Sequence, residues 1–367
     1  MKVLVTGSNG FIGKNLIVRL RELGISFETY TRGDSEKDLK SLVKRINFVV
    51  HLAGENRPKN KSDFKIVNTN LTQKLCNALR STGRRIPVIF TSSTQVELDN
   101  LYGLSKLSAE KILREFSTET GSPVHIYRLP NVFGKWCKPE YNSVVATFCY
   151  NISNDFPIEV HNVKTLLRLV YIDDVIDHFL KKITNPCKTG TDFPQVFPEY
   201  KVTLGELVSQ IKSFKNCRES LTSEEVGSGF LRALYSTFMS YLPPERFSYI
   251  VPKNSDSRGI FVEILKTKNS GQFSFFTVHP GVTRGGHYHH TKTEKFLVAK
   301  GEVKFQFRNI DTNDSYELDV SGETPVIVDV APGWSHNITN VGVDEVLIIL
   351  WANEVFDSKN PDTFFNQ

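Results

Sequence analysis

Residues Thr6–Gly13 read TGSNGFIG, and this short run decides how the first half of the chain folds. It follows an apolar, strand-like segment, Lys2–Thr6, and opens a helical pattern, Phe11–Glu22. Glycine at such a junction lets the backbone approach a pyrophosphate without a clashing side chain, and the free N–H groups of the helix start attract anions. A glycine-rich turn without a ligand is the alternative, but the position at the first strand-to-helix junction favours dinucleotide binding.

The same rhythm continues after this turn, because short apolar runs alternate with amphipathic stretches. Further strand candidates are Ser26–Tyr30, Phe48–Leu52, Val88–Thr91 and Val124–Arg128, and the helical patterns between them are Ser35–Lys44, Asp63–Ser81 and Gly103–Thr120. Repeated βαβ units of this kind build a parallel sheet that helices cover on both faces. We therefore expect a Rossmann-type, doubly wound α/β fold.

The texture of the sequence changes near Pro244. Just before it, Thr203–Glu206 is a capping-box signal that opens another helix, which we expect to run to about Phe214. From Phe247 onward, short β-rich runs are separated by Gly, Pro, Asn and Asp, without helix-length periodicity. The 367 residues also exceed what one hydrophobic core usually supports. These patterns predict two domains, 1–244 and 245–367, the second an all-β barrel or sandwich.

Composition excludes several classes of protein. The 45 basic and 40 acidic residues leave a net charge of only +5, without a long basic run, so no nucleic-acid partner is expected, although a phosphate-bearing substrate would suit. No stretch is apolar and long enough to cross a membrane, and no signal peptide precedes the first strand. The five cysteines are scattered and odd in number, which favours free thiols in a reducing compartment. We expect a cytoplasmic protein with no membrane partner.

The residues after the second strand candidate predict which nicotinamide cofactor is bound. A carboxylate at this place would accept a hydrogen bond from a ribose 2′-hydroxyl, whereas an arginine would meet a 2′-phosphate. Thr31 occupies the expected acidic position and Arg32 follows it. The pattern favours NADPH, and an arginine that only faces solvent is the alternative.

Tyr102 and Lys106, in the run YGLSK, lie one helical turn apart on one face of a predicted helix. A tyrosine is a poor acid or base at neutral pH unless a nearby ammonium favours its phenolate, which Lys106 can do. Ser93 ends the preceding strand, where its hydroxyl could hold a substrate carbonyl, and Ser92 is the alternative serine. The pair alone is common on helices, but here it follows a dinucleotide fingerprint.

A second set of chemistry-bearing residues lies in the β-rich part. His287 and His289 stand at alternate positions of a strand and so point to one side. Together with Glu294 and His336 they form three nitrogens and one oxygen, a set that suits Zn²⁺ or another divalent first-row metal. Histidines exposed in loops are the alternative for any one of them.

The N-terminal motifs resemble those of extended short-chain dehydrogenase/reductases of the nucleotide-sugar epimerase and dehydratase type. HLAG at His51–Gly54, YRLPNVFG at Tyr127–Gly134 and RLVYIDD at Arg168–Asp174 occur in that family's order. The resemblance implies that Tyr102 is a general acid toward a carbonyl, assisted by Ser93 and Lys106. One departure is Val96–Leu98, which replaces the common V-Y-G and shortens the substrate loop.

The same resemblance implies the binding residues. Asn131 and Arg168 match positions that contact a nucleotide diphosphate-sugar. The cofactor-binding residues that it implies, together with Lys106, are Gly7, Asn9, Gly10, Phe11, Ile12, Gly13, Arg32, Leu52, Ala53 and Gly54.

The C-terminal motifs resemble those of cupins. Gly281–Gly301 matches G-x5-H-x-H-x4-E-x6-G in full, and Pro332–Asn340 matches the second motif except for one missing residue between Pro and Gly. Arg258–Glu263 and Arg284–Tyr288 also resemble keto-deoxysugar epimerases, which invert carbons beside a ketone. This implies a metal that stabilises an enolate. Which side chain moves the proton stays open among Tyr288, His290 and Lys292.

Both domains in this order resemble a family of bifunctional capsular-polysaccharide enzymes, with shared runs at Phe133–Tyr150, Lys201–Glu206 and His289–Val298. The resemblance implies a homodimer that takes a UDP-linked 4-keto-6-deoxy amino sugar, epimerises C3 in the cupin and then reduces C4 with NADPH. The product would be UDP-2-acetamido-2,6-dideoxy-β-L-talose, a precursor of N-acetyl-L-fucosamine. The alternatives are a reductase whose cupin binds sugar without turnover, and a non-catalytic nucleotide-sugar-binding protein.

Overall fold

The computed structural model describes residues 1–58, 60–185, 189–251, 254–256, 259–261, 265–267, 271–354 and 359–365. By internal contacts the chain divides into two compact units. Unit 1 consists of residues 1–143 and 167–201, and unit 2 of residues 144–166 and 202–367. Within the described ranges, no helix has both the length and the apolar character that crossing a membrane requires.

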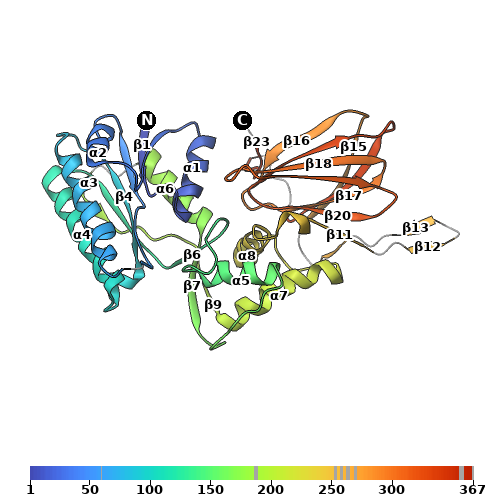
Figure 1. Cartoon of the computed structure of the whole chain (residues 1–367), viewed down its shortest axis with the longest axis horizontal. Coiled ribbons are helices and arrows are strands. Elements are labelled where there is room, and N and C mark those ends of the chain that lie inside the picture. The colour runs from blue at the N-terminus through green and yellow to red at the C-terminus, as the bar shows by residue number, and fades with distance from the viewer. Residues whose placement is uncertain are drawn as a thin grey trace. The chain divides into compact units, whose positions relative to one another are not determined.

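Unit 1 is built on a six-stranded parallel sheet with the strand order β2-β1-β3-β4-β5-β8. Helices cover both faces of this sheet (Figure 1). The strands are β1 (Lys2–Thr6), β2 (Ser26–Tyr30), β3 (Phe48–His51), β4 (Val88–Ser93), β5 (Val124–Leu129) and β8 (Thr191–Asp192). The helices are α1 (Phe11–Glu22), α2 (Glu36–Leu42), α3 (Leu71–Arg80), α4 (Leu101–Thr120) and α6 (Ile172–Thr184). The predicted doubly wound α/β fold is confirmed.

The core of unit 1 explains why these segments pair in parallel. Strands β3 and β4 are buried at every position, which is what a sheet covered on both faces requires. Leu75 and Leu79 of α3 and Leu113 and Phe116 of α4 pack into the same hydrophobic cluster as the strand residues. The order reverses between β2-β1 on one side and β3-β4 on the other, and ligands of open α/β sheets bind where the order reverses.

Smaller elements of the chain complete the first two hundred residues. They are a π-helical turn η1 (Phe64–Asn70), a 3-10 turn η2 (Thr94–Glu97) and the three-stranded sheet of β6 (Asn131–Phe133), β7 (Leu166–Tyr171) and β9 (Glu199–Thr203).

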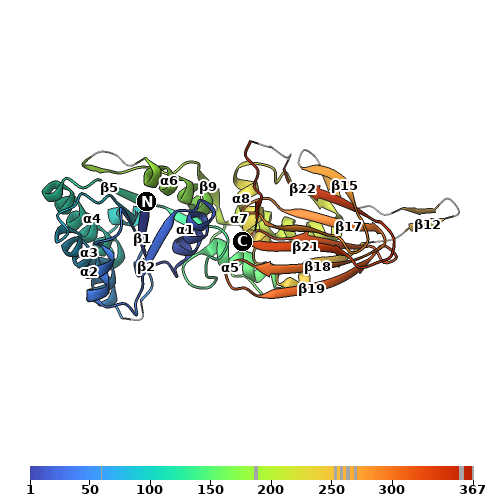
Figure 2. The same ribbon diagram turned by 90° about the horizontal axis from the view of Figure 1, so that it is seen from above.

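Unit 2 contains two five-stranded antiparallel sheets, seen in two orientations in Figures 1 and 2. One consists of β11 (Ser248–Ile250), β20 (Val326–Val330), β17 (Glu294–Lys300), β22 (Val346–Ala352) and β15 (Gln272–Val278), in that order. The other consists of β19 (Ser315–Ser321), β18 (Glu302–Asn309), β21 (Trp334–Asn340), β16 (Thr283–Tyr288) and β23 (Phe364–Phe365). Short elements are β10 (Thr222–Ser223), β12 (Asn254–Asp256), β13 (Gly259–Phe261), β14 (Lys266–Thr267) and η3 (Pro244–Arg246). The all-β prediction for the C-terminal part is confirmed.

Three helices belong to unit 2 as well, namely α5 (Val144–Ser153), α7 (Leu204–Ser220) and α8 (Gly229–Met239). The predicted capping box at Thr203 and Glu206 is present, and α7 runs past the expected Phe214 to Ser220. Pro244 is therefore where helices give way to strands along the chain. The contacts, however, group residues 144–166 and 202–244 with the strands, and the predicted domain boundary stays a prediction.

A buried charge cluster joins α7 to the first sheet of unit 2. The Lys295 Nζ atom lies 2.6 Å from the Asp329 carboxylate, and the Arg218 guanidinium of α7 lies 3.1 Å from the other Asp329 oxygen. Burial alone would lower the pKa of Lys295, but Asp329 raises it well above its usual value. Leu221, just after α7, also packs with Leu297 and Ile327 of the sheet. The helix is thus an integral part of this unit.

Candidate functional site

The glycine turn of unit 1 packs against the backbone that follows β3. Gly7 has a φ of +70°, and a Cβ atom there would lie 2.6 Å from the Ala53 nitrogen and 2.9 Å from the Leu52 carbonyl carbon. At Gly13 a Cβ atom would lie 2.3 Å from the Gly7 carbonyl oxygen. The turn therefore requires glycine at both positions. Gly10 caps α1 without a side-chain hydrogen bond, so the first turn keeps N–H groups for an anion.

Arg32, the predicted reader of a 2′-phosphate, lies just after β2 and is mostly exposed. Its Nη2 atom lies 2.8 Å from the Glu55 carboxylate, and the Tyr141 hydroxyl donates to the other Glu55 oxygen over 2.5 Å. Burial and the hydrogen bond to Glu55 raise the pKa of Tyr141 to about 12. Arg57 donates to the Tyr141 carbonyl over 2.6 Å. The arginine is thus held beside the loop that contains Ala53 and Gly54.

Tyr102 and Lys106 lie in the first turns of α4, beside the end of β4. Burial raises the pKa of Tyr102, and a hydrogen bond with the Ser93 hydroxyl acts in the opposite direction. Burial lowers the pKa of Lys106 to about 8, and its Nζ donates to the Thr91 carbonyl over 2.9 Å. The structure therefore brings Ser93, Tyr102 and Lys106 to one edge of the sheet. A neutral phenol one helical turn from a lysine is suited to give a proton to a carbonyl.

Ser92 has different partners from Ser93. Its hydroxyl donates to Glu110 over 2.5 Å, and Arg128 donates to both Glu110 oxygens over 3.0 and 2.7 Å. This buried group ties β4 and β5 to α4. The geometry favours Ser93 over Ser92 as the serine that faces a substrate.

Asn68 of the π-helical turn η1 is a site residue that sequence reasoning missed. It accepts a hydrogen bond from the Glu55 nitrogen over 2.7 Å and donates to the Glu55 carbonyl and the Ser105 hydroxyl, each over 2.9 Å. Ser105 in turn donates to the Tyr102 carbonyl over 2.7 Å. Asn68 therefore joins the loop after β3 to helix α4. An asparagine inside an amphipathic helical pattern, where it is unfavourable unless hydrogen-bonded, was the available signal.

Gly54 leaves space for the Lys106 side chain because it has no Cβ atom. A Cβ atom at Gly54 would lie 2.9 Å from Lys106 Nζ and 3.2 Å from Asn68 Oδ1. The predicted cofactor residues Leu52, Ala53 and Gly54 are thus adjacent to the turn at Gly7 on one side and to Lys106 on the other.

Asn131 and Arg168, the predicted substrate-binding pair, lie on neighbouring strands. Asn131 of β6 donates to the Arg168 carbonyl of β7 over 3.2 Å. The Arg168 guanidinium forms two hydrogen bonds with Glu199, over 2.7 and 2.9 Å, which raise its pKa, and about half of the side chain is exposed. The pair therefore presents an amide and a cation at the surface of the small sheet.

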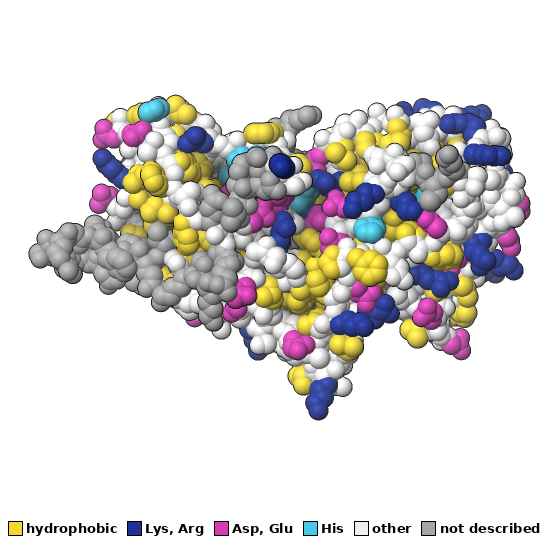
Figure 3. Space-filling model, turned by 180° about the vertical axis from the view of Figure 1, so that it is seen from behind, with side chains coloured by type: hydrophobic (Ala, Val, Ile, Leu, Met, Phe, Trp, Pro, Cys, Tyr) yellow, Lys and Arg dark blue, Asp and Glu magenta, His cyan; other side chains and the backbone are white. Residues whose placement is uncertain are grey.

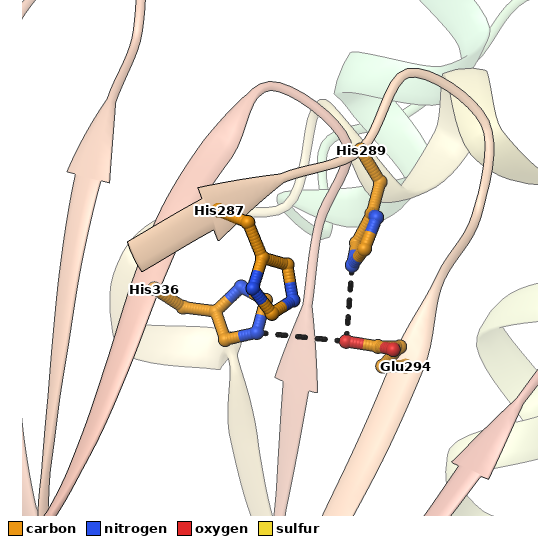
Figure 4. Close-up of side chains that lie close together, drawn as sticks. All are labelled: His287, His289, Glu294 and His336. Carbon is orange, nitrogen blue, oxygen red and sulfur yellow. Dashed lines mark hydrogen bonds and ion pairs between the residues drawn. The ribbon is translucent and has the colours of Figure 1, made fainter. Parts of the chain in front are cut away.

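The four predicted metal ligands come together in unit 2. His287 is the second-last residue of β16, and His289 directly follows this strand. Glu294 is the first residue of β17, and His336 lies in β21. One ligand atom from each lies within 4.8 Å of all the others. Figure 4 shows the four side chains pointing toward one another, with His289 Nε2 3.1 Å and His336 Nε2 3.5 Å from the same Glu294 oxygen.

A β-bulge aims the first histidine. The pairing of β16 with β21 shifts register between Gly285 and His287, and His287 then lies opposite His336. Gly285 and Gly286 have φ values of +120° and +76°, and a Cβ atom on Gly285 would lie 2.4 Å from the His336 carbonyl oxygen. The glycines of the run RGGHY therefore make possible the backbone that places His287.

The protonation states of the cluster fit a cation. Burial lowers the pKa of His336 to about 3, and burial followed by His289 lowers that of His287. Although burial opposes it, the neighbouring His289 keeps the pKa of Glu294 well below its usual value. Among the described atoms, His336 Nδ1 is buried without a hydrogen-bond partner. Neutral imidazoles around an ionised carboxylate are the form in which these side chains bind a metal.

A cavity of about 280 Å³ opens over the cluster. Its lining combines three of the four ligands with one arginine and mostly apolar side chains, namely Phe276, Arg284, Gly285, His287, Glu294, Phe296, His336, Ile338 and Leu350. Arg284 lies over the Phe276 ring, 5.3 Å from its centre. Such a cavity can take a small polar ring beside a metal.

The three candidates for moving a proton take different places. Tyr288 and His290 alternate with the ligands and pack against the Phe364 ring, away from the cavity lining. Lys292 Nζ lies 3.3 Å from a Glu294 oxygen, although Lys292 too is not one of the residues that line the cavity. Of the RG-x-F-x-E motif, Arg258, Val262 and Glu263 lie outside the described residues.

The surface agrees with the modest net charge. In Figure 3, basic and acidic side chains are interspersed over the described part of the face that is shown.

Two family models match the chain. The first, "NAD dependent epimerase/dehydratase family", matches residues 3–193, and the second, "Polysaccharide biosynthesis C-terminal domain", matches residues 254–364. A protein of Pseudomonas aeruginosa called UDP-2-acetamido-2,6-beta-L-arabino-hexul-4-ose reductase is 55% identical over 365 residues, which are 99% of this chain and 98% of the relative.

Solved structures give the same picture. The capsular polysaccharide assembling protein CapF of Staphylococcus aureus is 40% identical with a TM-score of 0.68, and the match covers 100% of both chains. MoeE5 in complex with UDP-glucuronic acid and NAD is 22% identical with a TM-score of 0.53, over 59% of this chain and 83% of that one. The second likeness concerns the fold alone.

Proposed function

The chain belongs to the NAD dependent epimerase/dehydratase family, and from that premise we propose that it reduces the C4 ketone of a UDP-linked 4-keto-6-deoxy amino sugar with NADPH. The observation that carries the proposal is the meeting of Ser93, Tyr102 and Lys106 at the edge of a sheet that also carries the glycine turn. The name of the 55% identical relative supports the substrate class.

NADPH, when bound, supplies a hydride to C4 of the sugar. The phenol of Tyr102 then gives its proton to the carbonyl oxygen, so that the ketone becomes an alcohol and the tyrosine becomes a phenolate. The Ser93 hydroxyl holds the carbonyl oxygen, and the charge on Lys106 stabilises the phenolate that remains. Arg32 would meet the 2′-phosphate once it leaves Glu55, and Asn131 with Arg168 would contact the diphosphate-sugar.

We further propose that unit 2 is a cupin that inverts C3 of the same sugar before the reduction. His287, His289, Glu294 and His336 would hold a divalent metal, with zinc the best fit to three nitrogens and one carboxylate. The metal, when bound, supplies positive charge that stabilises an enolate after the C3 proton leaves. Lys292, beside Glu294, is our candidate for moving that proton. The product would be UDP-2-acetamido-2,6-dideoxy-β-L-talose, made in the cytoplasm by a homodimer.

The two steps can be separated by incubating the protein with the UDP-4-keto-6-deoxy-N-acetylhexosamine and NADPH in D₂O. NMR of the sugar reports deuterium at C3, and absorbance reports NADPH oxidation. Tyr102→Phe should stop NADPH oxidation and leave the C3 exchange, because its hydroxyl is needed only for reduction. Tyr316→Phe, a tyrosine of β19, is the matched control. Normal oxidation by Tyr102→Phe would refute the role of this residue.

His287→Ala should have the opposite effect. It should stop the C3 exchange, as should a chelator, because one of four ligands is lost. His279→Ala changes an exposed histidine of the same unit and should leave exchange intact. If the unmodified protein never exchanges C3 but still oxidises NADPH, unit 2 binds sugar without turnover, and the bifunctional proposal fails while the reductase proposal stands.

A further inference from the structure

The loop between the second and third metal ligands, residues 289–293, is held by a segment far away in the sequence. We call residues 359–365 the C-terminal strap. Its last part, β23, pairs with β16, where Phe365 lies opposite His287 and Phe364 opposite Tyr288. The strap therefore lies along the strand that carries the first ligand.

Asp362 is the centre of the strap. One carboxylate oxygen accepts the His290 N–H over 2.8 Å, and the other accepts the N–H groups of Thr291 and Lys292 over 2.6 and 2.7 Å. The Thr291 hydroxyl adds a fourth hydrogen bond, over 2.8 Å. Three consecutive N–H groups that converge on one half-buried carboxylate fix the path of the loop between His289 and Glu294.

The strap also contacts a ligand directly. The main-chain carbonyl of Asp362 is hydrogen-bonded to Nδ1 of His289. A carbonyl can only accept, so Nδ1 must carry a proton, and Nε2 is the ring nitrogen left to bind a metal. His289 Nε2 is the atom that points at Glu294. A partner behind a histidine ligand that fixes its tautomer and orientation strengthens metal binding.

Residues outside the strap also contact this loop. Ser236 of α8 donates to the Thr291 carbonyl over 2.6 Å, and Arg232 of α8 hydrogen-bonds the Thr291 hydroxyl. Asn353, after β22, accepts the Thr293 N–H over 2.9 Å. The Gly333 N–H also donates to the His289 carbonyl over 2.9 Å, and the carboxylate of Asp362 adds the contacts that hold residues 290–292.

We propose that Asp362 is a positioning residue of the metal site: its carboxylate sets the loop, and its carbonyl sets the Nδ1–H tautomer of His289. This inference rests on the proposed metal site, and it assigns the positioning of one ligand, His289, to a residue that is not itself a ligand. It predicts that the chain keeps its fold without the Asp362 carboxylate and binds the metal poorly.

The test is zinc affinity of the full chain, measured by competition with a chromophoric chelator, together with the absorption spectrum of the Co²⁺-loaded protein. Asp362→Asn should weaken zinc binding by about 10- to 100-fold, the usual effect of losing a partner behind a ligand. It should also change the cobalt spectrum, because the ligand geometry changes. Asp319→Asn, an exposed carboxylate of the same unit, should change neither.

A second measurement needs no variant. In the unmodified metal-free protein, ¹⁵N NMR should show a proton on Nδ1 of His289, and an Nδ1 atom without a proton would overturn the proposal even if Asp362→Asn fails to fold. Zinc affinity and cobalt spectrum that stay unchanged in a folded Asp362→Asn would overturn it too. If the unmodified protein binds no zinc, the metal site itself fails, which is a distinct result.

Discussion

Lys106 is a cation in a place that penalises charge. Its side chain is almost completely buried beside the Phe90 ring, and burial lowers its pKa to about 8. The ammonium is therefore the main form below pH 8 and the neutral amine above it. Only the ammonium can stabilise the Tyr102 phenolate that reduction leaves.

We therefore expect kcat/KM for NADPH-dependent reduction to fall as the pH rises through about 8. The parameter kcat/KM is the relevant one because it reports groups of the free enzyme. Lys106→Met should lower it by about 100-fold or more at pH 7 and remove this limb of the profile. The control is Lys111→Met on the same helix. A flat profile from pH 7 to 9.5 in the unmodified protein would contradict the prediction.

Arg32 predicts the choice between the two nicotinamide cofactors. It lies beside Glu55 and is mostly exposed, so a 2′-phosphate can compete for its guanidinium. Arg32→Ala should weaken NADPH binding by about 10-fold, in line with one hydrogen bond between charged groups, and leave NADH binding unchanged. Binding can be followed by nicotinamide fluorescence. Arg114→Ala, an exposed arginine of α4, is the control, and equal losses for both cofactors would contradict a role at the 2′-phosphate.

Among single residues, the sequence predicted those that belong to a motif with a fixed spacing. His287 and His289 stand two residues apart at the end of β16, and Tyr102 and Lys106 stand one turn apart in α4, so local geometry brings each pair together. Asn68 and Asp362 could not be predicted in this way. Their partners, Ser105 and His289, lie far away in the sequence, and only the folded chain brings them within hydrogen-bonding distance.

At the scale of elements, α7 is held to the first sheet of unit 2 by Asp329, which neutralises two cations. Asp329→Asn leaves Lys295 and Arg218 buried without their anion, whereas Lys295→Met leaves the pair of Arg218 with Asp329. We expect Asp329→Asn to lower the free energy of unfolding by about 3–5 kcal/mol and Lys295→Met by clearly less.

Urea denaturation followed by circular dichroism measures both variants. Lys304→Met removes a partly exposed lysine of β18 and should cost less than about 1 kcal/mol. A larger loss for Lys295→Met than for Asp329→Asn would show that the carboxylate is not the group that holds the cluster together.

Alternation of apolar residues predicted the strands and helices because the pattern within an element is local. The capping box at Thr203 was predictable for the same reason, although α7 extends beyond the expected end at Phe214. What such patterns cannot predict is the surface against which a helix packs. The apolar face of α7 indicates that the helix is buried. The sequence does not indicate that Arg218 pairs with Asp329 or that Leu221 packs with Ile327, because these partners lie about a hundred residues later.

At the scale of the whole molecule, the change of texture at Pro244 predicts a domain boundary there, while the internal contacts group residues 202–244 with the β-rich part. Residues 202–244 supply Arg218, Arg232 and Ser236, all of which contact the β-rich part. The fragment 202–367 should therefore melt at a higher temperature and bind zinc more tightly than the fragment 245–367.

Circular dichroism and chelator competition on the two fragments make this comparison. We expect the difference to arise from the contacts of Ser236 and Arg232 with Thr291. The double variant Ser236→Ala with Arg232→Ala in the longer fragment should therefore bind zinc less tightly than the unmodified longer fragment. Equal melting temperatures and equal affinities for the two fragments would mean that the helices are not needed by the strands.

The assignment of α5 to unit 2 has a consequence for synthesis on the ribosome. Val145, Ala146, Phe148, Cys149 and Ile152 of this helix are all buried, and its helical partners in the fold are α7 and α8. Those partners emerge only after the sheet of unit 1 has been completed by β8. A growing chain must therefore carry an apolar helix without its cover for some fifty residues of elongation, and such exposed surface is what chaperones recognise and what aggregates. The yield of folded protein should thus rise when more chaperone is supplied during synthesis, although each unit is of ordinary domain size.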